Sequence, residues 1–391
     1  MINLAQESRY FIPPVNVLGK DTVSEIGEHI KRQNGTKALV VTDSVLVEIG
    51  IVEKVTDHLK DAGIDFVVFD GVQPNPTVSN VEAGLKLIDS ENIDVIVSLG
   101  GGSSHDCAKG IATVATNGGK IQDYEGLNQL NKPIMPLIAV NTTAGTASEM
   151  TRFCIITDED RKIKMAIVDW RVTPNVSIND PVLMLEKPQA LTANTGMDAL
   201  THAVEAYVST IANPLTDSAA EKAFELIGEN LRKVVANGSD YELREKMAYA
   251  QFLAGMAFNN ASLGLVHGMA HQLGGFYDLP HGICNAILLP HVTNFNKLAK
   301  PEKVAKMAEL LGENTEGLTL MEAADLGIKA IADLSADIGI PGSLKELDDV
   351  DPSDFETLAK NALADASSAT NPRQASLEDV VGIFKNAYEG F

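Results

Sequence analysis

Cysteine and positive charge are both scarce in this sequence. Three cysteines, Cys107, Cys154 and Cys284, are spread over 391 residues without C-x-x-C spacing, which argues against a disulfide framework and favours reduced thiols in a cytoplasm. There are 31 lysines and arginines against 53 aspartates and glutamates, so the formal net charge is -22. Because an acidic surface repels phosphate backbones and anionic lipid headgroups, we predict neither a nucleic acid nor a membrane as a partner.

Long apolar segments are also missing. No run approaches roughly 18 uninterrupted apolar residues, which is the length that indicates a membrane helix. The N-terminal segment MINLAQESRYFIPPVNVLGK lacks a basic region followed by an apolar stretch, so we expect no signal peptide. Hydrophobic residues make up 45% of the chain and charged residues 21%, which is typical of a globular protein and not of a disordered one.

The first half of the chain alternates between two patterns. Short apolar runs rich in β-branched residues predict strands over 36–44, 65–71, 94–103 and 136–143. Amphipathic segments predict helices over 46–62, 77–91 and 105–117. This alternation is typical of a parallel sheet with helical crossovers. Turn-like links favour antiparallel pairing, beside that sheet, for further strands expected over 153–158, 162–170 and 175–180.

The strand pattern ends at Pro181, and helix-favouring residues dominate from about Lys187 onward. At roughly 100–200 residues per domain, the length of the chain predicts two domains. We therefore expect a Rossmann-like α/β domain with a parallel sheet over residues 1–184. An all-helical domain is expected over residues 185–391.

Histidine is rare, yet it clusters in the second half. The chain has eight histidines, and the segment GLVHGMAHQLGGFYDLPHGICNA contains His267, His271 and His281. Upstream, TGMDALTHAVEAY places Asp198 and His202 four residues apart, the same spacing that separates the first two histidines of the cluster. Side chains four residues apart lie on one face of a helix, so each pair can reach one cation.

These residues predict a site for a divalent transition metal. Asp198 with three of the four histidines makes a four-ligand set, and a carboxylate with imidazoles suits Fe(II), Zn(II), Co(II) or Ni(II). The spacing leaves open which three histidines bind, and a single Asp/His pair also arises by chance. The segment HGMAH lacks the glutamate of HExxH, which excludes the zinc-protease motif.

A glycine-rich turn, GGGS at 100–103, follows one of the expected strands. Glycines let the backbone approach a phosphate, and the N-terminus of the following helix offers free N–H groups to it. The segment NTTAGTASE at 141–149 offers hydroxyl groups after the next strand. Asp43 ends an earlier strand, where a carboxylate would bind a ribose 2′-hydroxyl and repel a 2′-phosphate, favouring NAD over NADP. The motif G-x-G-x-x-G is absent, so a strand-to-helix turn without a ligand is the alternative.

Five segments together resemble the iron-dependent, or group III, alcohol dehydrogenases. They are GGGSSHDCAKGIA, NTTAGTASEMTRFCIITDE, TGMDALTHAVEAY, MAYAQFLAGMAFNNASLGLVHGMAHQLGG and LPHGICNAILLPHV. The resemblance extends from FIPPVNVLG to TNPRQ and is closest to the branch of ethanol-type iron alcohol dehydrogenases and 1,3-propanediol dehydrogenases. It departs at Ser104, where many members have proline. The resemblance implies the dehydroquinate synthase-like architecture, an α/β domain followed by a helical one.

The resemblance also implies a role for each candidate residue. It places the metal ligands at Asp198, His202, His267 and His281. It implies that His271 lies near the nicotinamide, as the candidate catalytic residue that relays a proton or orients the ring, with a packing role as the alternative. It places Phe258 in the substrate pocket. The implied NAD contacts are Asp43, Asn75, Gly101, Gly102, Ser103, Thr142, Thr143, Thr146, Lys164 and Leu183.

The implied function is an NAD-linked dehydrogenase that interconverts small primary alcohols or diols and aldehydes by hydride transfer. Fe(II), with Zn(II) or another divalent metal as alternatives, would act as a Lewis acid on the alcohol oxygen. A narrower alternative is 1,3-propanediol dehydrogenase, which reduces 3-hydroxypropionaldehyde. A second alternative is a non-catalytic assembly protein that binds NAD and metal.

The sequence around the candidate metal site favours an uncharged substrate. LAGMAFNNASLG and AILLPHV contain neither lysine nor arginine, which enzymes of this architecture that act on phosphorylated substrates would need. The resemblance further implies a homo-oligomer, a dimer or a larger assembly.

Overall fold

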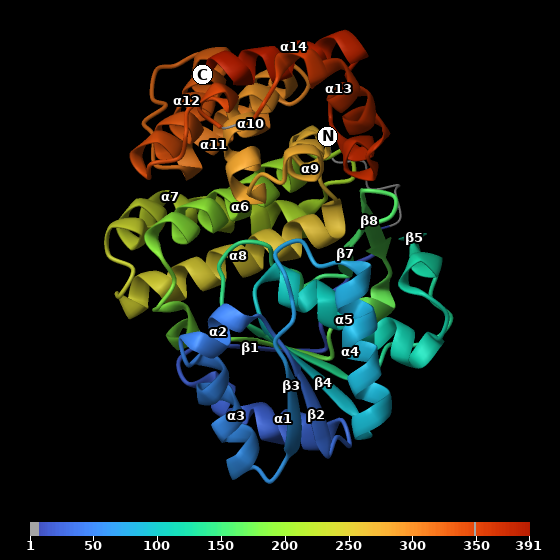
Figure 1. Cartoon of the computed structure of the whole chain (residues 1–391). Helices are drawn as coiled ribbons and strands as arrows, with labels where there is room; N and C mark the ends of the chain where they lie inside the picture. The colour runs from blue at the N-terminus through green and yellow to red at the C-terminus, as the bar shows by residue number, and fades with distance from the viewer. Residues whose placement is uncertain (1–7, 348) are drawn as a thin grey trace. The chain divides into compact units, whose positions relative to one another are not determined.

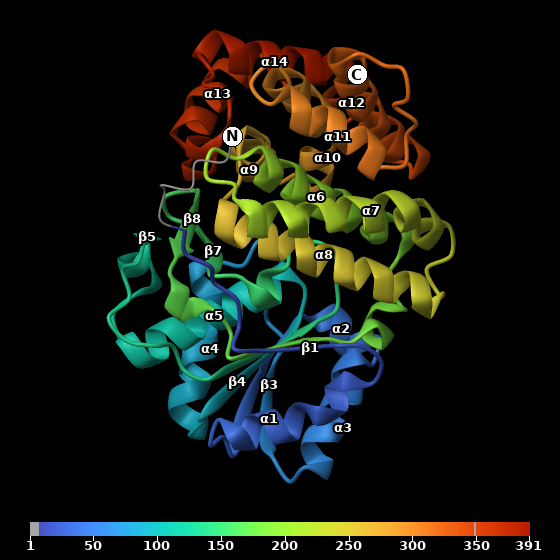
Figure 2. The ribbon, with the colours of Figure 1, turned by 180° about the vertical axis from the view of Figure 1, so that it is seen from behind.

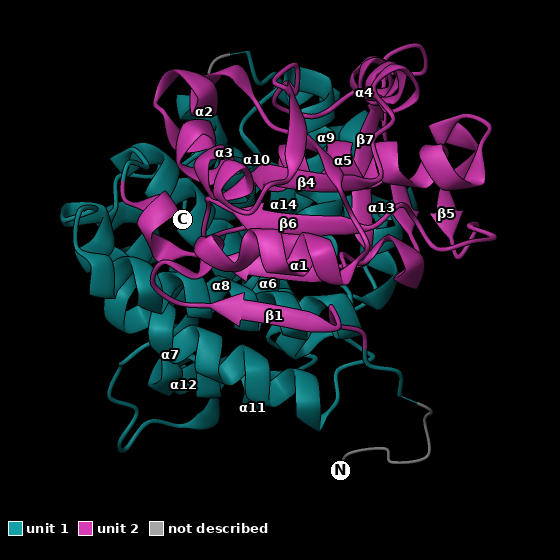
Figure 3. Ribbon diagram, turned by 90° about the horizontal axis from the view of Figure 1, so that it is seen from below, with its two compact units in different colours: residues 1–10, 186–391 teal, residues 11–185 magenta. Residues whose placement is uncertain are grey.

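The computed structural model describes residues 8–347 and 349–391. The chain forms two compact units, which Figure 3 shows in different colours. One unit contains Phe11–Leu185, and the other contains Glu186–Phe391 with residues 8–10. Within the described residues, no helix combines the length and the apolar character needed to cross a membrane.

A six-stranded parallel sheet organises the unit formed by Phe11–Leu185. The strands lie in the order β1-β9-β6-β4-β2-β3, and every neighbouring pair is parallel. Their bounds are β1 Val15–Leu18, β2 Lys37–Val41, β3 Asp65–Phe69, β4 Val95–Gly100, β6 Leu137–Asn141 and β9 Val176–Asn179. The central strands read as continuous apolar runs because both faces of a parallel sheet are covered.

Helices cover both faces of this sheet (Figure 1). They are α1 Ile26–Arg32, α2 Ser44–Glu48, α3 Ile51–Asp61, α4 Val78–Glu91 and α5 Gly102–Asn117. Successive residues of β2 enter different cores, because side chains alternate across a strand. Leu39 and Val41 pack with residues of α4 and α5, whereas Ala38 and Val40 pack with residues of α1 and α3.

The predicted helix over 46–62 is two helices, α2 and α3. Gly50 lies between them with a φ of 77°, in the left-handed region that glycine adopts without steric cost. The turn at Gly50 ends the first helix and lets the second begin in a new direction.

A small three-stranded sheet accompanies the main one. Its order is β5-β8-β7, with bounds β5 Gly126–Leu127, β7 Phe153–Asp158 and β8 Ile163–Val168. Strands β7 and β8 are antiparallel, as the sequence predicts, and β5 pairs with β8 in parallel.

The prediction for the last strand of this group is wrong. Strand β9 does not pair beside β8 but lies in the main sheet, parallel to both β1 and β6. The reason is packing: Val176 and Ile178 are buried in the core that contains α1 and α3, so the chain leaves the small sheet after β8. The edge strand β1, formed by VNVL, was not predicted at all.

The unit formed by Glu186–Phe391 is built from helices. They are α6 Gln189–Val208, α7 Pro214–Ala236, α8 Tyr241–Ala261, α9 Leu265–Tyr277, α10 His281–Asn296, α11 Pro301–Leu310, α12 Leu320–Asp337, α13 Phe355–Ala364 and α14 Leu377–Glu389. Helix α6 is buried along most of its length and packs against α7, α8 and α10 (Figure 2). Polar side chains on α6 therefore lie inside the helical unit, where each needs a partner.

Candidate functional site

Three helices of one unit bring the candidate metal ligands together. Helix α6 carries Asp198 and His202 one turn apart, helix α9 carries His267 in its first turn, and helix α10 begins at His281. Pro280 precedes α10 and fixes the backbone at its start, so the side chain of His281 leaves the helix at a defined position. Residues separated by 83 positions in the sequence thus meet at one point.

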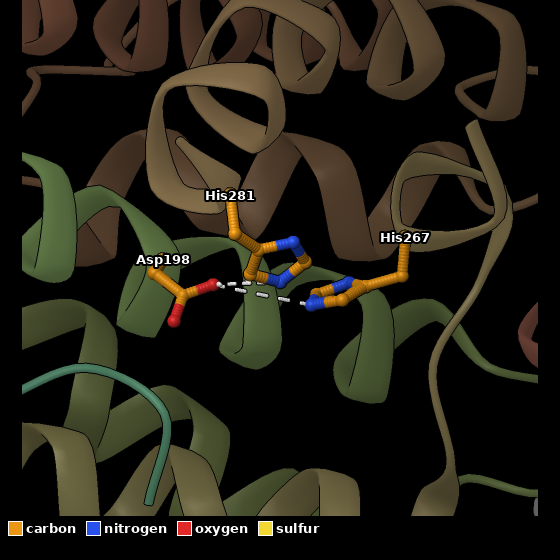
Figure 4. Close-up of side chains that lie close together, drawn as sticks. All are labelled: Asp198, His267 and His281. Atoms are coloured by element: carbon orange, nitrogen blue, oxygen red, sulfur yellow. Dashed lines mark ion pairs between the residues drawn. The ribbon is translucent and has the colours of Figure 1, made fainter. Parts of the chain in front are cut away.

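The distances are those of a cluster of ligand atoms. The Oδ1 atom of Asp198 lies 3.6 Å from Nε2 of His281, 3.8 Å from Nε2 of His202 and 4.0 Å from Nε2 of His267. Ligand atoms of Asp198, His267 and His281 all lie within 4.8 Å of one another, and Figure 4 shows these three side chains turned toward one another. His202 is outside that tightest group, although its Nε2 atom faces the same carboxylate oxygen.

The environment of His267 disfavours its protonated form. Burial, together with the neighbouring His202 and His271, holds the pKa of His267 well below its usual value. The side chain of His281 is 30% exposed, so the cluster has one more open side. An unprotonated imidazole nitrogen is the form that binds a metal ion. Three imidazoles and one carboxylate are a donor set that fits Fe(II) or Zn(II).

The rings around the cluster are packed in a fixed arrangement. His202 stacks on Phe258 with ring centroids 4.2 Å apart, and on its other neighbour, His267, with centroids 4.7 Å apart. Phe258 is buried and therefore holds the His202 ring in place. Its predicted place in the substrate pocket stays a prediction.

Asn285 is a site residue that the sequence analysis missed. Its Nδ2 atom donates to Oδ1 of Asp198 at 2.8 Å and lies 3.1 Å from Nε2 of His281 and 3.3 Å from Nε2 of His267. The amide thus contacts the acceptor atoms that face the centre of the cluster. The available signal was its spacing, because Asn285 lies four residues after His281 on α10.

Glu205 is a second missed residue. It lies on α6 seven residues after Asp198, a spacing that keeps both side chains on one face of the helix. Its Oε2 atom is 2.5 Å from Nδ1 of His267. Burial raises the pKa of Glu205 to about 7.

His271 lies beside the cluster and has a carboxylate partner of its own. Its ring stacks on that of His281 at 5.6 Å, and its Nδ1 atom is 2.9 Å from Oδ2 of Asp365. Burial works against ionisation of Asp365, but hydrogen bonds from His271 and Ser367 outweigh it and hold the pKa of Asp365 below its usual value. Asp365 therefore acts as a charged acceptor that orients the His271 ring.

The candidate nucleotide contacts gather at one edge of the parallel sheet. Strands β9, β6, β4 and β2 are consecutive neighbours, so their carboxyl ends lie side by side. Leu183 follows β9, the segment with Thr142, Thr143 and Thr146 follows β6, the GGGS turn follows β4, and Asp43 follows β2. In open α/β sheets, ligands bind at this edge.

The two loops at this edge contact each other through glycines. Gly101 precedes α5, and Gly102 and Ser103 form its first turn. A Cβ atom at Gly101 would lie 2.9 Å from Cγ2 of Thr143, and one at Gly102 would lie 2.9 Å from Cγ2 of Thr146. Only glycine permits this approach, which leaves the first N–H groups of α5 next to threonine hydroxyls.

The remaining candidates are placed as follows. Lys164 donates to Oδ1 of Asn75 at 2.8 Å, which joins two predicted contacts that are far apart in the sequence. The Oδ1 atom of Asp43 accepts a hydrogen bond from the backbone of Leu46 at 3.0 Å and caps α2. Leu183 is buried in the core beneath the sheet edge. Their contacts with a cofactor stay predictions.

Two family models match most of the chain. Residues 13–181 match the family model for iron-containing alcohol dehydrogenase, and residues 192–388 match the model for the C-terminal part of the Fe-containing alcohol dehydrogenase family. The chain is 55% identical over 381 residues to the 1,3-propanediol dehydrogenase of Citrobacter freundii, which covers 97% of this chain and 98% of that protein.

Two further similarities extend over nearly the whole chain. It is 50% identical over 380 residues to the NAD-dependent methanol dehydrogenase of Bacillus methanolicus, which covers 97% of this chain and 100% of that protein. A solved structure of 1,3-propanediol oxidoreductase matches with a TM-score of 0.96 and 53% identity, covering 98% of this chain and 100% of that one. The predicted fold class is thereby confirmed.

Proposed function

The chain belongs to the iron-containing alcohol dehydrogenase family and is an NAD-linked, iron-dependent alcohol dehydrogenase, and we propose that its substrates are small, uncharged primary alcohols or diols and their aldehydes. The observation that carries the proposal is the convergence of the side chains of Asp198, His202, His267 and His281. No lysine or arginine occurs in the neighbouring segments 253–264 and 286–292, so a phosphorylated substrate would lack a counter-charge there.

We propose that these four side chains hold the iron. When bound, a divalent cation supplies Lewis-acid polarisation of a substrate oxygen. The protein's own contribution is to lower the pKa of His267 by burial and to fix the His202 ring against Phe258. Asn285 donates to Asp198 and thereby fixes the direction of its carboxylate.

We propose that His271 exchanges the proton of the substrate hydroxyl group. Asp365 holds Nδ1 of His271, which leaves Nε2 as the nitrogen available for proton transfer. The hydrogen on the alcohol carbon leaves with both electrons of its C–H bond as hydride, which NAD accepts. The proton of the hydroxyl group therefore needs a separate acceptor. An imidazole next to the cluster can serve as that acceptor.

For the cofactor, we propose that the unit Phe11–Leu185 is the NAD-binding domain and that Glu186–Phe391 is the metal-binding domain, with residues 8–10 of the expected α/β domain lying in the helical unit instead. The sheet edge supports the first part: the N-terminus of α5 and the threonine hydroxyls would bind the diphosphate, and Asp43 would bind the adenosine ribose. The Asn75–Lys164 hydrogen bond places a cation next to the loop after β3.

Among the candidate substrates we place 1,3-propanediol and 3-hydroxypropionaldehyde first, because the Citrobacter freundii relative is a 1,3-propanediol dehydrogenase. The test measures the kinetics of Fe(II)-reconstituted protein with ethanol, 1-propanol, 1,3-propanediol, lactaldehyde and glycerol phosphate. The change in NADH absorbance reports the rate. We expect the highest kcat/KM for three-carbon substrates and no turnover of glycerol phosphate. If metal-loaded protein turned over none of these alcohols and aldehydes, the non-catalytic alternative would be favoured.

The cofactor preference gives a separate prediction. Because Asp43 also caps α2, Asp43→Gly removes both a charge and a cap, whereas Asp43→Asn removes the charge and keeps the cap. We expect both variants to raise the NADP-to-NAD ratio of kcat/KM by about tenfold or more, since a like-charge contact near the surface costs on the order of 1–4 kcal/mol. An unchanged ratio in both variants would exclude the ribose contact.

We also propose that the protein is a homo-oligomer and works in the cytoplasm. The family resemblance supports the first proposal, and three buried thiols, Cys107, Cys154 and Cys284, support the second. Size-exclusion chromatography with light scattering measures the subunit number directly.

A further inference from the structure

A buried glutamate on α6 is aimed at the candidate metal centre without belonging to the ligand set. The carboxylate of Glu205 is 2% exposed, so it has lost nearly all contact with water. A buried carboxylate is unfavourable unless charged or polar hydrogen atoms replace the water. The hydrogen-bond donors around the Glu205 carboxylate therefore indicate its role.

The two oxygens of Glu205 both bind the start of α9. Oε1 accepts a hydrogen bond from the backbone N–H of Val266 at 2.6 Å and a longer one from that of His267 at 3.4 Å. Oε2 lies 2.5 Å from Nδ1 of the His267 ring. The first N–H groups of a helix have no partner within the helix and favour negative charge, so the carboxylate satisfies them.

Gly264 makes this approach possible. It precedes α9, and a Cβ atom at this position would lie 2.8 Å from Oε1 of Glu205, closer than a carbon and an oxygen can pack. The residue before the helix is therefore kept small on the side that faces the carboxylate. Glycine, glutamate and histidine form one local arrangement.

We infer that Glu205 is a positioning residue for the metal centre: its carboxylate accepts the Nδ1–H of His267 and so directs the unprotonated Nε2 toward Asp198. A neutral imidazole carries one proton, and the nitrogen that holds it is set by the hydrogen bond of the other. Carboxylates that bind the second nitrogen of a ligand histidine fix the ring and its tautomer. This inference rests on the proposed role of His267 as a ligand.

The partners of Nδ1 differ among His202, His271 and His267. Nδ1 of His202 is buried and meets no hydrogen-bond partner among the described residues, so no carboxylate anchors that nitrogen, and the ring is held by stacking and by the contact of Nε2 with Asp198. His271 has a carboxylate partner in Asp365, but both side chains are partly exposed. His267 combines a carboxylate partner with burial of both side chains, so the contact that sets its tautomer is shielded from water.

The test is Glu205→Gln in the full-length protein. Glutamine has the same shape, and its oxygen can still accept from the backbone of α9, but its NH2 group then faces Nδ1 of His267 and donates to it. The proton of His267 must move to Nε2, the atom proposed to bind the metal. We expect Fe(II) and Zn(II) affinity, measured by competition with a chelator, to fall about 10- to 100-fold.

Glu221→Gln is the matched control. Glu221 lies on α7 and accepts a hydrogen bond from the hydroxyl of Tyr207, and within the described part of the chain it forms no hydrogen bond or ion pair with the proposed ligands. The metal affinity of Glu221→Gln should therefore equal that of the unmodified protein. Unfolding of both variants in metal-free form separates a folding defect from a metal-binding defect. Equal metal affinity of Glu205→Gln and the unmodified protein would overturn the inference.

A second measurement needs no variant of Glu205. Solid-state 15N NMR of histidine-labelled, metal-free protein reports which nitrogen of each ring is protonated, and His267→Asn identifies the His267 signals by their loss. We expect the proton on Nδ1 of His267, and a proton on Nε2 contradicts the inference. If His267→Ala keeps its metal, the assignment of His267 as a ligand fails. If His267→Ala loses its metal but Glu205→Gln binds metal with unchanged affinity, only the role of Glu205 is rejected.

Discussion

His267→Ala should lose its bound metal and at least about a thousandfold in turnover. The variant removes one of four proposed ligands and leaves Glu205 buried without its imidazole partner. A cation that polarises the substrate oxygen contributes several kcal/mol to the reaction, and each 1.4 kcal/mol is about tenfold in rate. Metal content by atomic absorption and kcat with the preferred alcohol measure the two effects.

The choice of control matters, because any substitution in a packed helix can disturb the fold. His58→Ala lies on α3 in the other unit and should keep both metal and activity. Asp198→Asn tests the same centre from α6 while keeping the side-chain shape, and it too should lose metal. A His267→Ala protein that retained full metal content and turnover would refute the proposed ligand set.

The parallel sheet could be predicted because its strands are buried on both faces. A strand such as KALVV, which became β2, is apolar at every position but the first and stands out between polar helices. The pairing of β9 could not be predicted in this way. Nothing within NVSIND says whether it pairs with β8, which is nearby in sequence, or with β6, which is not; the long-range packing of Val176 and Ile178 decides it.

The same division applies to the site. Asp198 and His202 could be proposed because helical periodicity places residues four apart on one face. Glu205 lies seven residues after Asp198, a spacing that also places both on one face of the helix, but a glutamate in a helix is usually exposed to water. Asp365 carried no signal, because it lies 94 residues from His271 and meets it only through the packing of α9 and the turn after α13.

His271→Ala should keep its metal and still slow turnover by about 10²- to 10⁴-fold, the range for removal of a positioned acid or base. His271 is one turn after His267 on the same helix, so the pair separates metal binding from proton transfer in one structural setting. Loss of metal in His271→Ala would mean that this histidine, and not one of the four proposed, is a ligand.

Asp365→Asn extends this test to the partner of His271. The amide keeps the shape of the carboxylate but donates to Nδ1, so the proton of the imidazole moves to Nε2 and the ring can no longer accept a proton there. We therefore expect Asp365→Asn to lower kcat in the alcohol-oxidising direction nearly as much as His271→Ala, with unchanged metal content. The double variant should be no slower than His271→Ala alone, because residues that act as one unit are not additive. Additive losses would show that Asp365 acts on something other than His271.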